Sequence, residues 1–256
     1  MQALVLAHPL AFARGMLAAR EKGRVEASLF RMKARGMAHS YTAVFSRLAK
    51  TYGVTVVAGS ILLQEAQVAG LGVEPGANDA TLQNVTAVFR PDGSPHDKLA
   101  RKCYPILAEQ PFVQPAALDG LPVFDTPAGR LGVLVCADAW YPAPYDRLRR
   151  NGVQLLAVPS FIDHAGAWDS PWGGYNGSLA PQDVDPGDIQ RLSEGQAWRK
   201  YALAGRLSSS GAQAGINVFL QASLWDMTSD GLSLAKKGDE TTAVSTRRGA
   251  LLNQWL

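Results

Sequence analysis

The sequence predicts an α/β protein, and two observations carry that prediction. Short apolar runs without polar alternation recur along the 256 residues, and such runs are typical of strands that are covered on both faces. Helix-like segments stand between these runs. Where a strand, a helix and a second strand follow one another closely, as over residues 131–158, a parallel strand pair with a right-handed crossover is expected.

The composition agrees with one domain over residues 1–256 that buries a large core. Hydrophobic residues make up 47% of the chain and charged residues 18%, which excludes a disordered or coiled-coil protein. The formal net charge is only +3 and the basic residues are scattered, so nucleic acid is not an expected partner. No apolar run reaches the roughly 18–20 residues that span a bilayer, so no membrane is expected either.

The first predicted elements are a helix and a strand. Between Gly36 and Tyr52 apolar residues recur every three or four positions, which indicates a helix with one apolar face. Gly53 suits the left-handed cap that ends such a helix. The β-type run over residues 54–63 is expected to be an interior strand.

A loop is expected over residues 64–81, because that stretch is rich in Gly, Ala, Asn and Pro. Strands are predicted over residues 84–89 and 131–136, a short helix over 142–151, and a further strand over 153–158.

The last part of the chain begins with an irregular excursion at about residues 160–192, which is interpreted as a surface segment or a lid. Its Trp168, Trp172 and Tyr175 either cap a pocket or pack on the surface. A helical stretch over residues 194–214 and strands over 216–222 and 241–244 are expected to follow.

The two cysteines, Cys103 and Cys136, allow no cysteine-rich metal site and fit a reducing, cytoplasmic setting. Cys136 closes a predicted strand, at the end where open α/β sheets bind ligands. It is therefore either an inert core residue or a nucleophile, whereas Cys103 is expected to be a packed thiol. A cysteine nucleophile needs a base and a cation for the oxyanion. Lys102 can be that cation, and Glu109 supplies a carboxylate in the same stretch.

In their order and spacing these residues resemble the nitrilase superfamily of carbon-nitrogen hydrolases. The resemblance is specific over about residues 45–160 and weaker over 200–235. The matching motifs are Leu48–Gly53 leading into Val56–Ser60, Asn84 at the start of a strand, Asp92-Gly93, Arg101-Lys102, Gly132–Asp138 and Gly152–Ser160.

The resemblance implies a role for each candidate site residue. It makes Cys136 the nucleophile, Lys102 the residue that stabilises the tetrahedral intermediate, and Glu109 the glutamate that helps to position the substrate. The backbone N–H of Ala137 is the expected oxyanion donor, and Trp140 is expected to bind substrate.

The resemblance also implies a fold and a reaction. The fold is a four-layer α-β-β-α sandwich, here lacking its first strand and helix, that pairs into a homodimer. The reaction is hydrolysis of a non-peptide carbon-nitrogen bond in a small amide, carbamoyl compound or nitrile, through a cysteine thioester acyl-enzyme. No metal or organic cofactor is implied, and the choice between an amide and a nitrile stays open.

One departure from the family pattern concerns the general base. The family's base glutamate follows an early strand, and here the acids upstream of the first predicted helix are Glu21 and Glu26, both expected to be solvated helix charges. The expectation is therefore that the native chain starts upstream of Met1 and supplies the base there. The alternative is a catalytically incompetent fragment, or a non-catalytic binding module that retains the fold.

Overall fold

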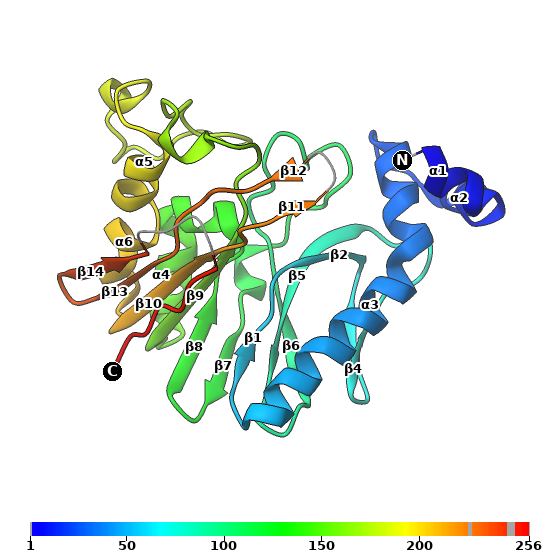
Figure 1. Cartoon of the computed structure of the whole chain (residues 1–256), viewed down its shortest axis with the longest axis horizontal. Coiled ribbons are helices and arrows are strands. Elements are labelled where there is room, and N and C mark those ends of the chain that lie inside the picture. The colour runs from blue at the N-terminus through cyan, green and yellow to red at the C-terminus, as the bar shows by residue number, and fades with distance from the viewer. Residues whose placement is uncertain (1, 225–226, 245–248, 256) are drawn as a thin grey trace. The chain divides into compact units, whose positions relative to one another are not determined.

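The computed structural model describes residues 2–224, 227–244 and 249–255, and the chain divides into two compact units (Figure 1). The first unit, residues 1–116, contains helices α1 (Gln2–Ala7), α2 (Pro9–Ala18) and α3 (Arg24–Tyr52), and strands β1 (Val56–Val57), β2 (Ile61–Gln64), β3 (Gln67–Ala69), β4 (Gly72–Glu74), β5 (Leu82–Phe89) and β6 (Pro95–Arg101).

The second unit covers residues 117–256. Its strands are β7 (Val123–Thr126), β8 (Gly129–Val133), β9 (Leu155–Ser160), β10 (Ala214–Phe219), β11 (Ser223–Leu224), β12 (Met227–Thr228), β13 (Leu234–Lys237) and β14 (Glu240–Ala243). Its helices are α4 (Pro142–Arg150), α5 (Glu194–Tyr201) and α6 (Leu203–Arg206), with the 3-10 helices η1 (Leu118–Gly120), η2 (Cys136–Trp140), η3 (Ala167–Asp169), η4 (Pro186–Asp188) and η5 (Leu207–Ser210).

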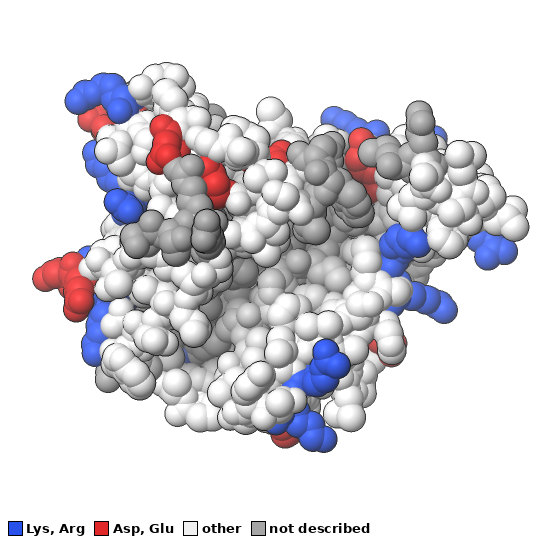
Figure 2. Space-filling view, in the orientation of Figure 1, with Lys and Arg blue, Asp and Glu red and all other residues white. Residues whose placement is uncertain are grey.

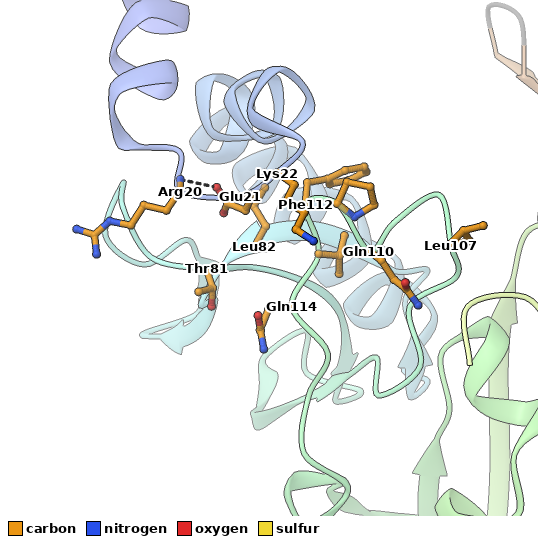
Figure 3. A pocket seen from close by; sticks show the side chains of 11 residues that line it. Arg20, Glu21, Lys22, Thr81, Leu82, Leu107, Gln110, Phe112 and Gln114 are labelled. Atoms are coloured by element: carbon orange, nitrogen blue, oxygen red, sulfur yellow. Dashed lines mark hydrogen bonds between the residues drawn. The ribbon is translucent and has the colours of Figure 1, made fainter. Parts of the chain in front are cut away.

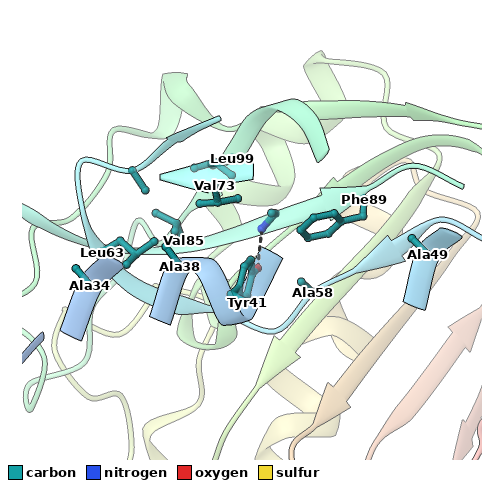
Figure 4. Packing of buried hydrophobic residues seen from close by; sticks show 12 residues of the cluster. Ala34, Ala38, Tyr41, Ala49, Ala58, Leu63, Val73, Val85, Phe89 and Leu99 are labelled. Atoms are coloured by element: carbon teal, nitrogen blue, oxygen red, sulfur yellow. Dashed lines mark hydrogen bonds between the residues drawn. The ribbon is translucent and has the colours of Figure 1, made fainter. Parts of the chain in front are cut away.

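Helix α3 confirms the first predicted helix, although it begins at Arg24 rather than at Gly36. It ends as predicted, because Gly53 adopts the left-handed conformation with φ +60°. Small residues such as Ala34 and Ala38 let the helix approach the sheet closely (Figure 4). Tyr41 fixes that approach, because its hydroxyl donates to Gly59 O at 2.8 Å and accepts the N–H of Ala87 at 3.0 Å.

The sheet of the first unit is antiparallel and centres on β5, which confirms the strand predicted over residues 84–89. The prediction of one interior strand over residues 54–63 was wrong. The run breaks into β1 and β2, which pair with successive parts of the same edge of β5, while β6 pairs with its other edge. The break falls where the carbonyl of Gly59 binds Tyr41 instead of a strand. The expected loop over 64–81 also contains the β3–β4 hairpin.

The sheet of the second unit has the strand order β14-β13-β10-β9-β8-β7. Strands β8, β9 and β10 are parallel, and α4 joins β8 to β9, which confirms the predicted strand-helix-strand unit. The predicted strand over residues 131–136 ends earlier, at Val133. Cys136 therefore lies beyond the strand, as the first residue of η2, and not at the strand's last position.

The predicted helix over residues 194–214 is broken into α5, α6 and η5. The strands predicted over residues 216–222 and 241–244 correspond to β10 and β14, and β13 lies between them in the sequence and in the sheet.

The excursion between β9 and α5 has little regular structure, but it is packed rather than loose. Trp168 and Trp172 are only 4% and 1% exposed. Trp172 stacks on Tyr201 of α5 with ring centroids 5.3 Å apart. Arg206 at the end of α6 donates to Asp183 at 2.6 and 3.1 Å. These contacts anchor the segment on the second unit through a few buried aromatic residues, while most of its other residues are exposed, as a surface segment requires.

The segment before α3 consists of helices, and between Gln2 and Gly23 the structure describes no strand. Glu21, expected to be a solvated charge, is instead paired with the buried guanidinium of Arg31 at 2.5 and 3.1 Å. Burial alone would raise the pKa of Glu21, but the hydrogen bonds and charge of Arg31, together with backbone N–H donors, outweigh it and hold that pKa below its ordinary value. Glu26 is exposed, as predicted.

Charged side chains are dispersed on the face shown in Figure 2, and both signs are present there. Among the described residues, no helix has both the length and the apolar character that a membrane span requires.

Candidate active site

The thiol of Cys136 lies at the start of η2, just beyond the carboxyl end of β8. Its backbone is left-handed, with φ +51°, a conformation that costs a non-glycine residue about 1–2 kcal/mol. The side chain is half-buried, and its Sγ lies 3.6 Å from the carbonyl oxygen of Phe161, which follows β9. A strained cysteine at the ends of parallel strands is placed where α/β proteins bind ligands.

Asp138 holds the turn that carries the cysteine. Its side chain is fully buried, and its Oδ2 accepts the N–H of Val135 at 3.0 Å. In return the N–H of Asp138 donates to the carbonyl of Val135 at 3.1 Å. These two hydrogen bonds join Asp138 to Val135 and so fix the backbone on either side of Cys136. A carboxylate two residues beyond the cysteine was the one sequence signal that could have pointed to this role.

Ala137 and Trp140 belong to the same 3-10 helix as the cysteine. The first N–H groups of a helix have no partner within it, so the N–H of Ala137 is of the kind that can donate to an oxyanion. The indole of Trp140 stacks on Trp172 with ring centroids 5.6 Å apart and meets Trp198 edge-on at 4.8 Å. Trp140 thus joins η2 to the aromatic core of the second unit.

Lys102 and Glu109 come together in the first unit. Lys102 follows β6, is 3% exposed, and its Nζ lies 2.5 Å from Oε2 of Glu109. The N–H of Ile106 also donates to Oε2, at 2.9 Å, and Nδ2 of Asn84 donates to Oε1 at 3.1 Å. A carboxylate with these donors is fixed in position, and it holds the ammonium group of the lysine in turn.

Two backbone bonds shape the loop that carries this pair. The N–H of Lys102 donates to the carbonyl of Asn84, and the carbonyl of Lys102 accepts the N–H of Ala116, both at 2.9 Å. Cys103, the next residue, is buried with its Sγ 3.7 Å from Arg101 O, which confirms that it is a packed thiol.

A cavity of about 480 Å³ opens beside this loop in the first unit (Figure 3). Its wall includes residues on both sides of Glu109 in the chain and combines amide, hydroxyl, charged and apolar side chains. The lining residues are Arg20, Glu21, Lys22, Thr81, Leu82, Leu107, Gln110, Pro111, Phe112, Val113 and Gln114.

The structure thus gathers the predicted residues into two groups. Lys102 and Glu109 share one network in the first unit, and Cys136, Ala137 and Trp140 share η2 in the second. Within the described ranges, no cluster of three or more His, Cys, Asp or Glu side chains is arranged to hold a metal ion.

Comparison with known proteins identifies the family of this chain. The family described as carbon-nitrogen hydrolase matches residues 14–245, on both sides of the boundary between the units. This chain therefore belongs to the carbon-nitrogen hydrolase family of enzymes.

Solved structures agree on the fold, which is the mixed α/β fold of the nitrilase superfamily. A carbon-nitrogen hydrolase from Helicobacter pylori G27 is 19% identical with a TM-score of 0.59, over 92% of this chain and 73% of the other. A variant of the amidase from Nesterenkonia sp. AN1, in complex with butyramide, is 13% identical with a TM-score of 0.54, over 88% and 65%. A branch 10 member of the superfamily from Saccharomyces cerevisiae is 16% identical with a TM-score of 0.53, over 77% and 57%.

A curated relative matches over a short stretch. The deaminated glutathione amidase of Yersinia enterocolitica is 45% identical over 40 residues, which are 16% of this chain and 14% of that protein.

Proposed function

We propose that this protein hydrolyses a non-peptide carbon-nitrogen bond in a small molecule, through a thioester on Cys136. The observation that carries the proposal is the left-handed cysteine at the head of η2, beyond the ends of parallel strands. Strain of this kind is found where a side chain is presented for chemistry.

The reaction proceeds in two halves. The sulfur of Cys136 attacks the carbonyl or nitrile carbon. For an amide, the carbon-nitrogen bond then breaks, and the nitrogen leaves as ammonia or an amine that carries the proton. Water attacks the thioester, releases the carboxylic acid and restores the thiol. With a nitrile, the attack of the sulfur gives a thioimidate; one water then adds to its carbon and ammonia leaves, which gives the same thioester.

Lys102 and the N–H of Ala137 are the proposed donors to the oxyanion of the tetrahedral intermediate. Support for the lysine role comes from its buried ion pair, because Glu109 holds the ammonium group in place. Trp140 is proposed to form one wall of the acyl site, four residues after the nucleophile.

We propose that both units form one functional domain, since the family match crosses their boundary. We also propose that the protein works as a homodimer in the reducing cytoplasm, on small-molecule substrates and without a cofactor. An amide is the first substrate class to test, because the curated relative and the Nesterenkonia protein are both amidases.

A specific observation favours a second candidate, a non-catalytic protein with the same fold. The proton acceptor for Cys136 is unassigned, since Glu21 is bound to Arg31 and Glu26 faces solvent. Removing one member of a catalytic unit costs several powers of ten in rate. The two candidates therefore differ in turnover, and not in fold.

The deciding experiment combines labelling with turnover. Fluoroacetamide left an acetamide moiety on the active-site cysteine in a variant of the Nesterenkonia amidase, and it serves as the probe here. Peptide mapping should find one acetamide moiety on Cys136 and none on Cys103. An ammonia-release screen over amides and nitriles should show turnover that Cys136→Ala abolishes. A folded protein that is not labelled and releases no ammonia is instead the non-catalytic module.

A further inference from the structure

The loop that follows β9 lies against the reactive thiol. Its first carbonyl, that of Phe161, accepts the hydrogen bond of Cys136 Sγ at 3.6 Å. A main-chain carbonyl stays at that distance only while its loop is held still. The position of the thiol therefore depends on whatever fixes residues 161–168.

Two side chains from the segment before β13 fix this loop. The N–H of Ile162 lies 3.4 Å from Oγ of Ser229. Asp230, which is 7% exposed, accepts the N–H of Gly166 at 2.8 Å with Oδ2 and that of Trp168 at 3.2 Å with Oδ1. The two oxygens of one carboxylate thus accept two backbone N–H groups at the start of η3.

The end of the loop at Trp168 is held by packing as well. The indole of Trp168 meets Phe219 of β10 edge-on, with ring centroids 5.2 Å apart. It also lies directly on Gly195 of α5, where an added Cβ would stand 2.4 Å from the ring. Asp230 therefore binds the loop at the point where Trp168 packs against β10 and α5.

We propose that Asp230 is a positioning residue for the nucleophile: it holds residues 166–168 so that the carbonyl of Phe161 keeps the Cys136 thiol in one orientation. The inference rests on the proposed function, because it assigns a purpose to that orientation. In this role Asp230 works through its hydrogen bonds to Gly166 and Trp168. It acts only through the loop.

The test compares Asp230→Ala and Asp230→Asn with a matched control. Asp185→Ala removes a carboxylate that accepts the N–H of Gly187 at 2.8 Å at the start of η4, so it deletes the same kind of cap on a 3-10 helix elsewhere in the excursion. Turnover of an amide, the alkylation rates of both cysteines by iodoacetamide, and thermal unfolding are measured for each protein.

Loss of the anchor should move turnover and thiol accessibility in opposite directions. For Asp230→Ala, kcat falls roughly tenfold or more, with KM within about twofold, because a misplaced nucleophile slows the chemical step and not binding. Cys136 is alkylated about threefold faster once the loop uncovers it, while the buried Cys103 keeps its slow rate. Asp230→Asn retains one acceptor oxygen. Its kcat and its Cys136 alkylation rate should therefore lie between those of Asp230→Ala and those of the unmodified protein.

Two results would overturn the inference. One is a kcat and a Cys136 alkylation rate for Asp230→Ala that both match those of Asp185→Ala. The other is faster alkylation of Cys103 together with Cys136, which indicates general loosening of the fold. If the unmodified protein releases no ammonia, the proposed function fails, and the selective change in Cys136 alkylation still decides whether Asp230 controls the loop.

Discussion

At the scale of single residues, the Lys102–Glu109 pair is a largely buried ion pair of the first unit. The ammonium group is almost completely buried, and the carboxylate accepts three hydrogen bonds. A buried charge that loses its partner cannot be solvated, so the two residues depend on one another for stability as well as for any role in catalysis.

We expect Glu109→Gln to lower the free energy of unfolding by about 2–4 kcal/mol, because it removes the carboxylate charge that pairs with the buried ammonium group of Lys102. The double variant Lys102→Met/Glu109→Gln should regain part of that loss, since it removes the charge as well. Urea unfolding of the two single variants and the double variant completes the cycle. Additive losses in the double variant would show that the two side chains do not depend on one another.

At the scale of elements, helix α5 contains a titratable group in an unusual setting. Glu194, its first residue, is half-buried, and the loss of solvation raises the pKa of its carboxyl to about 7. In the unfolded chain the same carboxyl titrates near 4.5. Between these two values the folded state binds the proton and the unfolded state does not.

Glu194 should therefore make the protein less stable as the pH rises from about 4.5 to 7, by at most about 3 kcal/mol. Urea midpoints at pH 5, 6, 7 and 8 measure the effect, and Glu194→Gln should flatten the profile over this range. Glu240→Gln, in the exposed part of β14, is the matched control and should leave the profile unchanged. An identical slope for the two variants would contradict the assignment.

One buried side chain, that of Arg206, links the excursion before α5 to helix α6. Arg206 is buried, and it donates to Asp183 and to the carbonyl of Tyr201. Its pairing with Asp183 ties the excursion to α6. Leu179, four residues from that carboxylate, is 93% exposed and so accessible to a protease.

Arg206→Met should expose the excursion to proteolysis, because Asp183 loses its partner while the volume of the side chain is nearly kept. Thermolysin, which cuts before large apolar residues, should cleave at Leu179 about tenfold faster than in the unmodified protein. Arg199→Met removes an exposed arginine from α5 and should not change the rate. Equal cleavage of both variants would show that Arg206 does not order this segment.

At the scale of the whole molecule, the sequence predicted the elements with the strongest periodicity. Three parts of the fold were predicted: the end of α3, strand β5, and the unit from β8 to β9. In each of them, apolar residues are followed by a Gly or a Pro that ends the pattern. The β3–β4 hairpin within residues 64–81 was not predicted, because strands of three residues are too short to show a hydrophobic period. The break between β1 and β2 arises from a tyrosine of α3, a contact that local sequence does not encode.

The candidate site was predictable to a similar degree. Lys102, Glu109 and Cys136 stand in a recognisable order, and their local settings agree with that order. The contribution of Phe161 comes from a backbone carbonyl, which any residue could supply, so no sequence signal marks it. Asp230 reaches its loop only through the folding of the second unit, and it is distant from Cys136 in the chain.

A homodimer is the expected state of the whole molecule. Multi-angle light scattering should give twice the 27.4 kDa of one chain, independent of salt, because a net charge of +3 provides little long-range attraction or repulsion. The mass of a single chain across the micromolar range would rule the dimer out.

The left-handed backbone at Cys136 also has a consequence for the protein's evolution. A residue with a Cβ is disfavoured there, whereas glycine adopts φ +51° without that penalty. Cys136→Gly should therefore be about 1 kcal/mol more stable than Cys136→Ala, although neither can form a thioester. If selection for chemistry is relaxed, drift at this position should favour glycine, so a glycine in the same turn of a homologue would mark a lineage that has exchanged activity for stability.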